Sequence, residues 1–178
     1  MANGVAGFFS RVFYGVPVDS HEVLLCGHNR MGYHILKKLQ KLRKNVMVVD
    51  WNPEVVSKLR KENVASVRGN VGSQRFLSGI DLSATELCIS TVPSYKDNVR
   101  LLRHFKNEKK NVPVILTAQS FDDAMKLYKE GAHYVIMPHY LGGKHVSLLM
   151  EDFSVKNFVS HRRSHLKEIV IQKKRGHM

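Results

Sequence analysis

Short aliphatic runs recur along the chain from residue 21 onward, and each is followed by a longer segment of mixed polar and apolar residues. Within a run the apolar residues are consecutive rather than alternating, which is typical of strands that are buried on both faces of a sheet. This pattern predicts six strands. They are Val23–Cys26, Val46–Val49, Ala65–Val67, Leu87–Ser90, Val114–Leu116 and Tyr134–Met137.

The segments between the runs predict amphipathic helices. In the first, an apolar stripe lies opposite a lysine-rich face. The stripe consists of Met31, Ile35, Leu36, Leu39 and Leu42. A later helix begins after Ser120, a capping residue followed three places on by Asp123, and ends at Gly131. Strands that alternate with helices predict an α/β fold, a Rossmann-like doubly wound parallel sheet of six strands in the order 3-2-1-4-5-6.

Two segments lie outside the predicted sheet, which occupies residues 21–140. Residues 1–20 are unusually apolar for a chain terminus, so we expect them to form a linker that packs on, or leads from, something else. Residues 141–178 predict a C-terminal helical extension that ends in a basic tail.

The 178-residue chain has a net charge of +13, and this charge is unevenly distributed. Residues 153–178 carry seven basic residues and one acidic residue, which is nearly half of the excess. Most other lysines lie on predicted helices, where a solvated face explains them. The basic tail is therefore the part of the sequence that points to an anionic partner, such as nucleic acid or lipid headgroups.

Composition narrows the class of protein further. With 43% apolar and 24% charged residues, the chain resembles a globular domain and not a disordered, collagen-like or low-complexity protein. Cys26 and Cys88 lie inside apolar runs, so we expect buried, reduced thiols in an intracellular protein. No stretch approaches the ~18 consecutive apolar residues of a spanning helix, and the N-terminus lacks the basic lead of a signal peptide.

One stretch carries candidate binding chemistry, because Gly27-His28-Asn29-Arg30-Met31-Gly32 joins the first strand to the first helix. Gly27 permits a tight turn, and Gly32 lets the helix pack closely on the sheet. The backbone N–H groups at the start of the helix would face a pyrophosphate. Asp50 ends the second strand 23 residues after Gly27, near the spacing at which a carboxylate accepts both ribose hydroxyls of an adenosine.

Two residues of this turn leave alternatives open. Asn29 stands where the usual glycine pattern has its middle glycine; asparagine tolerates unusual backbone angles, so the turn can still form. The alternative is a Rossmann-like domain that no longer binds a nucleotide. Arg30 lies at the start of a helix, where the dipole disfavours a cation, which makes sense if its guanidinium contacts phosphate. The alternative for Arg30 is a solvent-facing side chain.

From about residue 21 to 152 the sequence resembles the RCK domain, also called KTN or TrkA-N, a cytosolic regulatory module of potassium channels and transporters. The resemblance rests on the glycine turn, on Asp50 and on three further motifs. They are Val67-Arg-Gly-Asn70, Ser90-Thr91, and the segment from Gly131 to Gly143, which looks most like the version fused to monovalent cation:proton antiporters. Family members often carry Asp in place of Asn70 and Arg near Gln119.

The resemblance implies a regulatory ligand, either NAD(H) or an adenosine phosphate (AMP, ADP or ATP). Residues from Gly27 to Gly32 would hold its phosphates and Asp50 its ribose. Four residues would frame the adenine: Trp51, Asn52, Asn70 and Val71. Thr91 and Val92 would lie beside the rest of the ligand. NADP is not expected, because the charge of Asp50 repels a 2′-phosphate and no basic residue immediately follows it.

The resemblance also implies partners and a location. Such modules form homodimers and act on an attached membrane domain, here the transport domain of a cation:proton antiporter or a potassium channel. The chain would then lie on the cytoplasmic side of the cell membrane. Within the C-terminal extension, Gly142 and Gly143 give freedom to a helix whose apolar stripe suits a partner helix. The alternative is that this stripe packs on the protein's own sheet. The stripe consists of Val146, Leu149, Met150 and Phe153.

Other function classes explain less of the sequence. An NAD-dependent oxidoreductase would need a substrate domain, yet the sheet uses the chain through Pro138 and leaves 40 residues. Its general acid would have to be His139 or His145, which we interpret as ordinary polar residues. A nucleic-acid-binding protein would use the basic tail, but that tail matches no named recognition motif. His161 and His165 have helical spacing, yet no nearby carboxylate or cysteine completes a metal site. We therefore expect neither catalysis, nor a metal, nor nucleic-acid binding.

Overall fold

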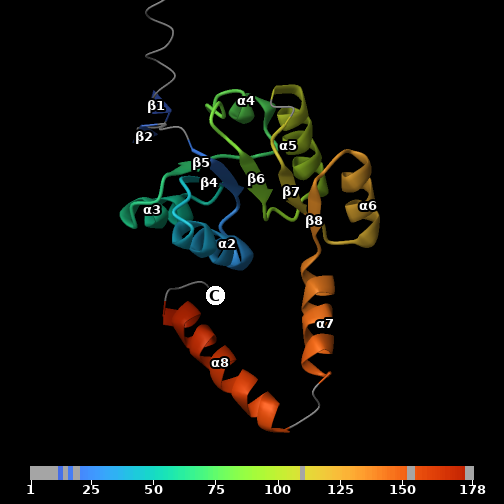
Figure 1. The fold of residues 1–178 in the computed structure, drawn as a ribbon. Helices are drawn as coiled ribbons and strands as arrows, with labels where there is room; N and C mark the ends of the chain where they lie inside the picture. The colour runs from blue at the N-terminus through green and yellow to red at the C-terminus, as the bar shows by residue number, and fades with distance from the viewer. Residues whose placement is uncertain (1–11, 14–15, 18–20, 109–110, 152–154, 175–178) are drawn as a thin grey trace, which may run out of the picture. The chain divides into compact units, whose positions relative to one another are not determined.

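The computed structural model describes residues 12–13, 16–17, 21–108, 111–151 and 155–174 (Figure 1). The chain divides into two compact units, of which the first ends at Ile136 and the second begins at Met137. The first unit contains the sheet and the candidate site, and the second contains two helices.

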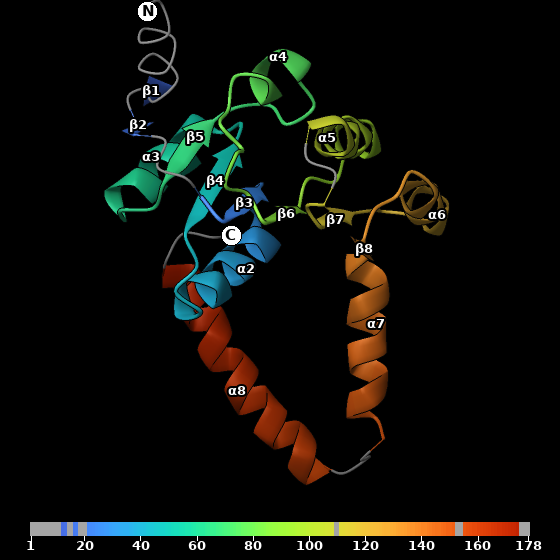
Figure 2. The same cartoon turned by 45° about the horizontal axis from the view of Figure 1, so that its top comes forward.

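Six parallel strands form the sheet of the first unit, in the order β5-β4-β3-β6-β7-β8 (Figures 1 and 2). Counted along the chain, this is the predicted order 3-2-1-4-5-6, so the predicted Rossmann-like fold is confirmed. The strands are β3 (Val23–Cys26), β4 (Val46–Asp50), β5 (Ser66–Arg68), β6 (Leu87–Ser90), β7 (Val114–Thr117) and β8 (Tyr134–Ile136). Each lies within about one residue of its predicted bounds.

The sheet is buried on both faces, as the aliphatic runs predict. Every residue of the central strands β3 and β4 is buried. Both cysteines are buried and unbonded, and burial raises the pKa of the Cys88 thiol well above its ordinary value. The thiol therefore stays neutral within the core.

Five helices accompany the strands: α2 (Arg30–Lys41), α3 (Pro53–Lys61), α4 (Gln74–Leu77), α5 (Tyr95–Glu108) and α6 (Phe121–Lys129). Leu36 and Leu39 of α2 and Leu59 of α3 pack in one cluster with residues of β3 and β4. Figure 1 shows α4 and α5 on the opposite side of the sheet. Leu42, placed in the apolar stripe by its spacing, is instead exposed, because α2 ends at Lys41 and the chain turns there.

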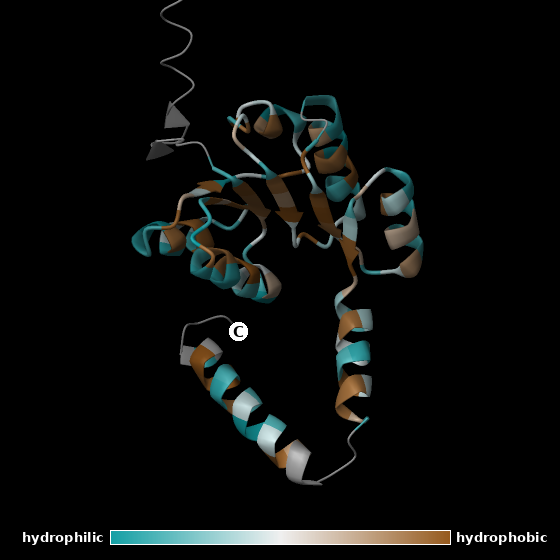
Figure 3. Ribbon diagram, viewed as in Figure 1, coloured by the Kyte–Doolittle hydropathy of each residue, from teal (hydrophilic) through white to brown (hydrophobic). Residues whose placement is uncertain are grey.

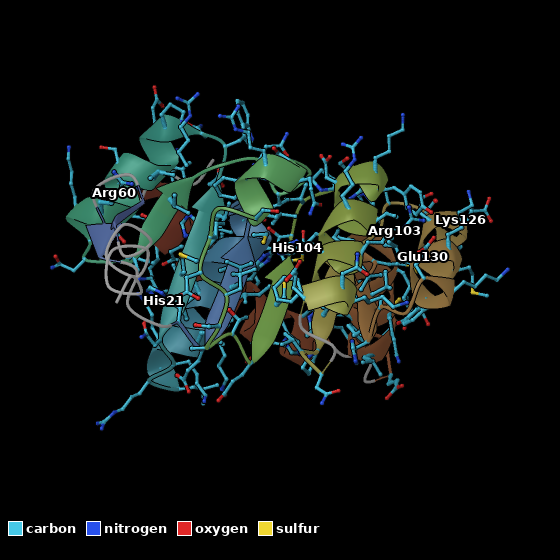
Figure 4. The ribbon with its side chains drawn as sticks, turned by 90° about the horizontal axis from the view of Figure 1, so that it is seen from above. His21, Arg60, Arg103, His104, Lys126 and Glu130 are labelled. Carbon is cyan, nitrogen blue, oxygen red and sulfur yellow. The ribbon has the colours of Figure 1, made fainter. Side chains whose placement is uncertain are left out.

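Side chains cap the helices where the sequence predicts a start. The Ser120 hydroxyl accepts the N–H of Asp123 at 3.1 Å. Gly131, which follows the end of α6, has a φ of +99°. The predicted cap and stop of this helix are both confirmed. Across the surface, the Arg103 guanidinium of α5 binds the Glu130 carboxylate after α6 at 2.8 Å (Figure 4). This bond holds the pKa of Glu130 below its usual range, but water screens the exposed pair.

The N-terminal segment contributes a short antiparallel pair, β1 (Val12–Phe13) and β2 (Val16–Pro17). Most of the predicted linker over residues 1–20 lies outside the described residues, so the linker stays a prediction.

The second unit consists of α7 (Pro138–Leu149) and α8 (Val155–Lys174). Proline at the first position begins α7 three residues before the predicted boundary at 141. No residue of α7 is buried, and Figure 3 shows apolar and polar bands alternating along it. Across the described residues, no helix has both the length and the apolar character needed to span a bilayer.

The buried His104 makes the stability of the fold depend on pH. Its ring is 6% exposed and meets Phe105 edge-on, and Nδ1 has no hydrogen-bond partner among the described residues (Figure 4). Burial lowers its pKa, and Glu108 offsets this only in part. As the pH falls, His104 therefore takes up a proton in the unfolded chain before it does so in the folded protein. The free energy of unfolding decreases for this reason as the pH falls below about 6.5.

We predict that His104→Leu flattens this dependence. Denaturant unfolding about one pH unit above and below 6.5 should show a smaller loss of stability in the variant than in the parent chain. The matched control is His139→Leu, because His139 is exposed. Equal slopes in His104→Leu and the parent chain would show that the proton is taken up elsewhere.

Candidate functional site

The carboxyl ends of β3, β4 and β6 meet around a cavity of about 350 Å³. In an open parallel sheet a crevice at this edge, where the strand order reverses, is the usual place for a ligand. Eleven residues line it: Gly27, Val49, Asp50, Trp51, Gly69, Asn70, Val71, Val92, Pro93, Ser94 and Asp97.

Gly27 makes the turn off β3 with a φ of +85°, a conformation that other residues rarely adopt. Its N–H donates to the carbonyl of Val49 at 2.7 Å. A Cβ at Gly27 would lie 2.6 Å from Oγ1 of Thr91. The turn therefore requires glycine both for its conformation and for its packing.

Gly32 brings α2 against this turn. A Cβ at Gly32 would collide with the carbonyl oxygen of Gly27, which is backbone and cannot move aside. This contact confirms the packing role predicted for Gly32, and it fixes the start of α2 beside the cavity wall at Gly27.

Asn29 shapes the turn by hydrogen bonding and not by backbone freedom. Its φ of −71° and ψ of −171° are ordinary extended values, so the tolerance for unusual angles expected from the sequence is not used. Its Oδ1 accepts the N–H of Gly32 at 3.0 Å, and its Nδ2 donates to the carbonyl of Thr91 at 2.9 Å. Asn29 thus caps α2 and ties it to the end of β6.

Asp50 holds the other side of the turn. Its Oδ2 accepts the N–H of His28 and its Oδ1 accepts the N–H of Asn52, each at 2.8 Å. The residue is 9% exposed and lines the cavity. Because each carboxylate oxygen has two lone pairs, both oxygens can accept a further hydrogen bond from a ligand.

Six of the thirteen residues proposed for ligand binding line the cavity: Gly27, Asp50, Trp51, Asn70, Val71 and Val92. Trp51 is 75% exposed there, an unusual state for a large aromatic side chain. The Asn70 side chain accepts the N–H of Gly72 at 2.8 Å and so shapes the loop after β5.

The other seven residues do not line the cavity. Asn52 caps α3 by accepting the N–H of Glu54 at 2.9 Å. Thr91 is buried, and its hydroxyl donates to the carbonyl of Gly27 at 2.9 Å, so it braces the turn. The remaining five form the turn and the start of α2: His28, Asn29, Arg30, Met31 and Gly32.

Arg30 is exposed at the first position of α2. The Asn29 side chain accepts the N–H of Gly32 and not those of Arg30 and Met31, and the first N–H groups of a helix have no acceptor within the helix itself. This end of α2 can accept an anionic group beside the cavity.

Sequence reasoning missed five lining residues: Val49, Gly69, Pro93, Ser94 and Asp97. Asp97 lies in the first turn of α5, 3.7 Å from the Arg100 guanidinium. A Cβ at Gly72 would collide with the Asp97 carboxylate, so the loop after β5 packs on the start of α5. The sequence did contain a signal for Ser94 and Asp97, because polar residues that follow β6 lie at the same edge of the sheet as the Gly27 turn.

The buried amide of Asn98 fixes the loop that carries Val92 and Pro93. It is fully buried, accepts the Ser90 hydroxyl at 2.7 Å, and donates to the carbonyls of Val92 at 2.9 Å and Thr117 at 2.8 Å. One side chain thereby joins the ends of β6 and β7 to α5.

Comparison with protein families matches residues 23–138 to the model of the TrkA-N domain. This segment covers the sheet and the whole candidate site. The chain belongs to the TrkA-N domain family. The resemblance stated from the sequence motifs is therefore confirmed.

Two curated proteins are similar to this chain in sequence. Potassium channel protein 1 of Methanocaldococcus jannaschii is 22% identical over 142 residues, which is 79% of this chain and 43% of the relative. A protein of Methanothermus fervidus is 24% identical over 147 residues, or 81% of this chain and 23% of the relative. The chain thus spans less than half the length of the curated relatives that it matches.

Solved structures share the TrkA-N fold. The TrkA-N domain of the Escherichia coli inner membrane protein ybaL has a TM-score of 0.69 at 20% identity, covering 74% of this chain and 98% of its own. The Kef C-terminal domain of Shewanella denitrificans, in AMP-bound form, has a TM-score of 0.62 at 12% identity. The match covers 85% of this chain and 93% of the Kef domain. The GsuK channel bound to NAD has a TM-score of 0.59 at 21% identity, and the match covers 67% of this chain and 22% of the GsuK chain.

We predict that Asn98→Leu destabilises the TrkA-N domain by about 2–4 kcal/mol, because the buried Ser90 hydroxyl loses its acceptor and the carbonyls of Val92 and Thr117 lose the donor Nδ2. Urea unfolding measures the change. Asn107→Leu is the matched control, since Asn107 is exposed near the end of the same helix and should change stability little. A loss equal to that of the control would contradict a structural role for the Asn98 amide.

Proposed function

We propose that this chain is a regulatory domain that senses an adenine nucleotide and controls the transport of potassium or another monovalent cation. The ligand is NAD(H) or an adenosine phosphate, and it acts as a signal. The observation that carries the proposal is the cavity beside the Gly27 turn, in which Asp50 and Trp51 lie on one wall.

The cavity suits the adenosine part of such a ligand. The Asp50 oxygens have lone pairs left for the two ribose hydroxyls, and Trp51 offers an exposed ring against which a base can stack. Val49, Val71 and Val92 supply apolar surface for the base. The volume of about 350 Å³ lies within the range of small-molecule sites.

The phosphates belong outside this cavity, at the start of α2. Among the described lining residues there is no Lys, Arg or His, while two carboxylates, Asp50 and Asp97, are present. The backbone N–H groups of Arg30 and Met31 and the Arg30 guanidinium supply the positive charge that the cavity lacks. His28, Asn29 and Gly32 hold this arrangement in place.

The structural neighbours support the class of ligand. They include a Kef domain in AMP-bound form and the GsuK channel bound to NAD or to ADP. All three ligands contain adenosine, the part that the cavity fits. A potassium channel among the curated relatives supports the role in cation transport. The proposal includes an attached transport domain in the membrane. It also places this chain on the cytoplasmic side of that membrane.

The second unit supplies the proposed dimer contact. Val146 and Leu149 of α7 line a groove of about 590 Å³ that also includes Phe158 and Leu166 of α8, and Met150 after α7 is half exposed. Phe153 of the predicted stripe lies outside the described residues. We propose that a helix of a second copy fills this groove, so that a ligand that favours one dimer arrangement can act on an attached membrane domain.

Asp50→Asn should weaken the binding of NAD, AMP or ADP by about 1.5–3 kcal/mol, because a charged acceptor of ribose hydroxyls is lost and one amide N–H faces a backbone donor. Isothermal calorimetry measures the affinity. Asp122→Asn makes the same chemical change at an exposed position of α6 and should bind normally. If the parent chain binds none of these ligands, the proposed function is wrong.

We predict a homodimer in solution whose scattering profile changes with nucleotide. Val146→Asp/Met150→Asp should give monomers, because two carboxylates would be buried in the contact. Met125→Asp is the control, since Met125 is equally exposed on α6 in the first unit. Light scattering and small-angle scattering provide the readout. A parent chain that stays monomeric while binding nucleotide would remove the proposed coupling.

A further inference from the structure

Two sides of the helix α8 have different surroundings. One side lines the groove with α7, and it includes Phe158, Arg162 and Leu166 as well as His161, His165 and Glu168. The other side takes no part in that groove. It consists of Val159, Arg163, Lys167, Val170 and Ile171, which we call the outer face of α8. Their spacing of three or four residues places all five on one side of the helix.

The outer face combines exposed apolar side chains with cations. Val159, Val170 and Ile171 are 41–50% exposed, and Arg163 and Lys167 are exposed as well. Glu168, the one acidic residue of α8, lies on the groove side, so no carboxylate neutralises the two cations on their own face. Such an arrangement favours an anionic surface that also accepts apolar groups.

We propose that the outer face of α8 binds the surface of a bilayer that contains anionic lipids. The branched apolar side chains enter the boundary between headgroups and acyl chains, and Arg163 and Lys167 pair with lipid phosphates. A nucleic acid would use the two cations but would leave Val170 and Ile171 in water. A second protein core would bury those apolar groups but would also bury two unpaired cations.

The described residues contain no helix suited to span a membrane. In the proposed contact, α8 lies in the plane of the bilayer surface. The net charge of residues 153–178, seven basic residues against one acidic, adds attraction along the whole segment. The proposal does not depend on the nucleotide site, because α8 belongs to the second unit and the cavity to the first.

The test is co-sedimentation of the full 178-residue chain with vesicles. We expect binding to vesicles made of equal parts phosphatidylcholine and phosphatidylglycerol, weaker binding at high salt, and little binding to pure phosphatidylcholine. Arg163→Gln/Lys167→Gln should lower the partition coefficient about thirtyfold, since each cation near an anionic surface contributes about one factor of five. Val170→Ser/Ile171→Ser should also lower it, because insertion is lost.

Matched controls separate this contact from general attraction of a basic protein. Lys38→Gln/Lys41→Gln removes the same charge from exposed positions of α2 and should bind vesicles nearly as the parent chain does. Arg163→Lys keeps the charge and should retain binding. Circular dichroism checks the fold, and nucleotide calorimetry should be unchanged in all α8 variants, so a failure here leaves the proposed function standing.

Four outcomes would overturn the proposal. The first is sedimentation of the parent chain with pure phosphatidylcholine as readily as with the anionic vesicles, and the second is an equal loss of binding in the α2 and α8 charge variants. A change of the parent dimer to monomers in Val170→Ser/Ile171→Ser, with vesicle binding intact, would assign the outer face to a second copy of the chain. Tight, salt-sensitive binding of duplex DNA without vesicle binding would assign it to a nucleic acid.

Discussion

The carboxylate of Asp50 holds together the edge of the sheet on which the candidate site is built. Its two oxygens accept the N–H groups of His28 and Asn52, so one side chain fixes both the turn after β3 and the start of the segment that leads to α3. A carboxylate buried at this depth must be satisfied by donors, and the two loops provide them. The cavity wall, the helix start and the exposed position of Trp51 all follow from this arrangement.

Most of the sheet could be predicted from the sequence because its strands are buried on both faces. Consecutive aliphatic residues then have one explanation, and the turn at Gly27 followed by Asp50 sets the order of the first strands. The site was harder to predict because spacing identifies a turn but not what each side chain contacts. Asn29 and Thr91 brace the turn, while Ser94 and Asp97 line the cavity from the residue before α5 and from its first turn, where no motif was recognised.

The second unit follows different physical rules from the first. In the first unit, strands and helices bury a continuous apolar core, whereas α7 buries no residue and α8 exposes Phe158, Leu166 and Ile169. Apolar helices of this kind gain little from their own chain, so their stability depends on what covers them. Periodicity could therefore predict that a helix follows Pro138, but not which surface it contacts.

The cap formed by Asn29 has a consequence for how quickly and how faithfully a ligand is detected. Because Asn29 and Asp50 already hold the turn through bonds within the protein, the turn needs no ordering when a ligand arrives. A ligand at the proposed site would cost the protein little entropy, and encounter rather than loop rearrangement would set the association rate. Such a preformed receptor tracks the concentration of its ligand rapidly. If the cavity takes the adenosine as proposed, discrimination between ligands must come from the groups beyond it.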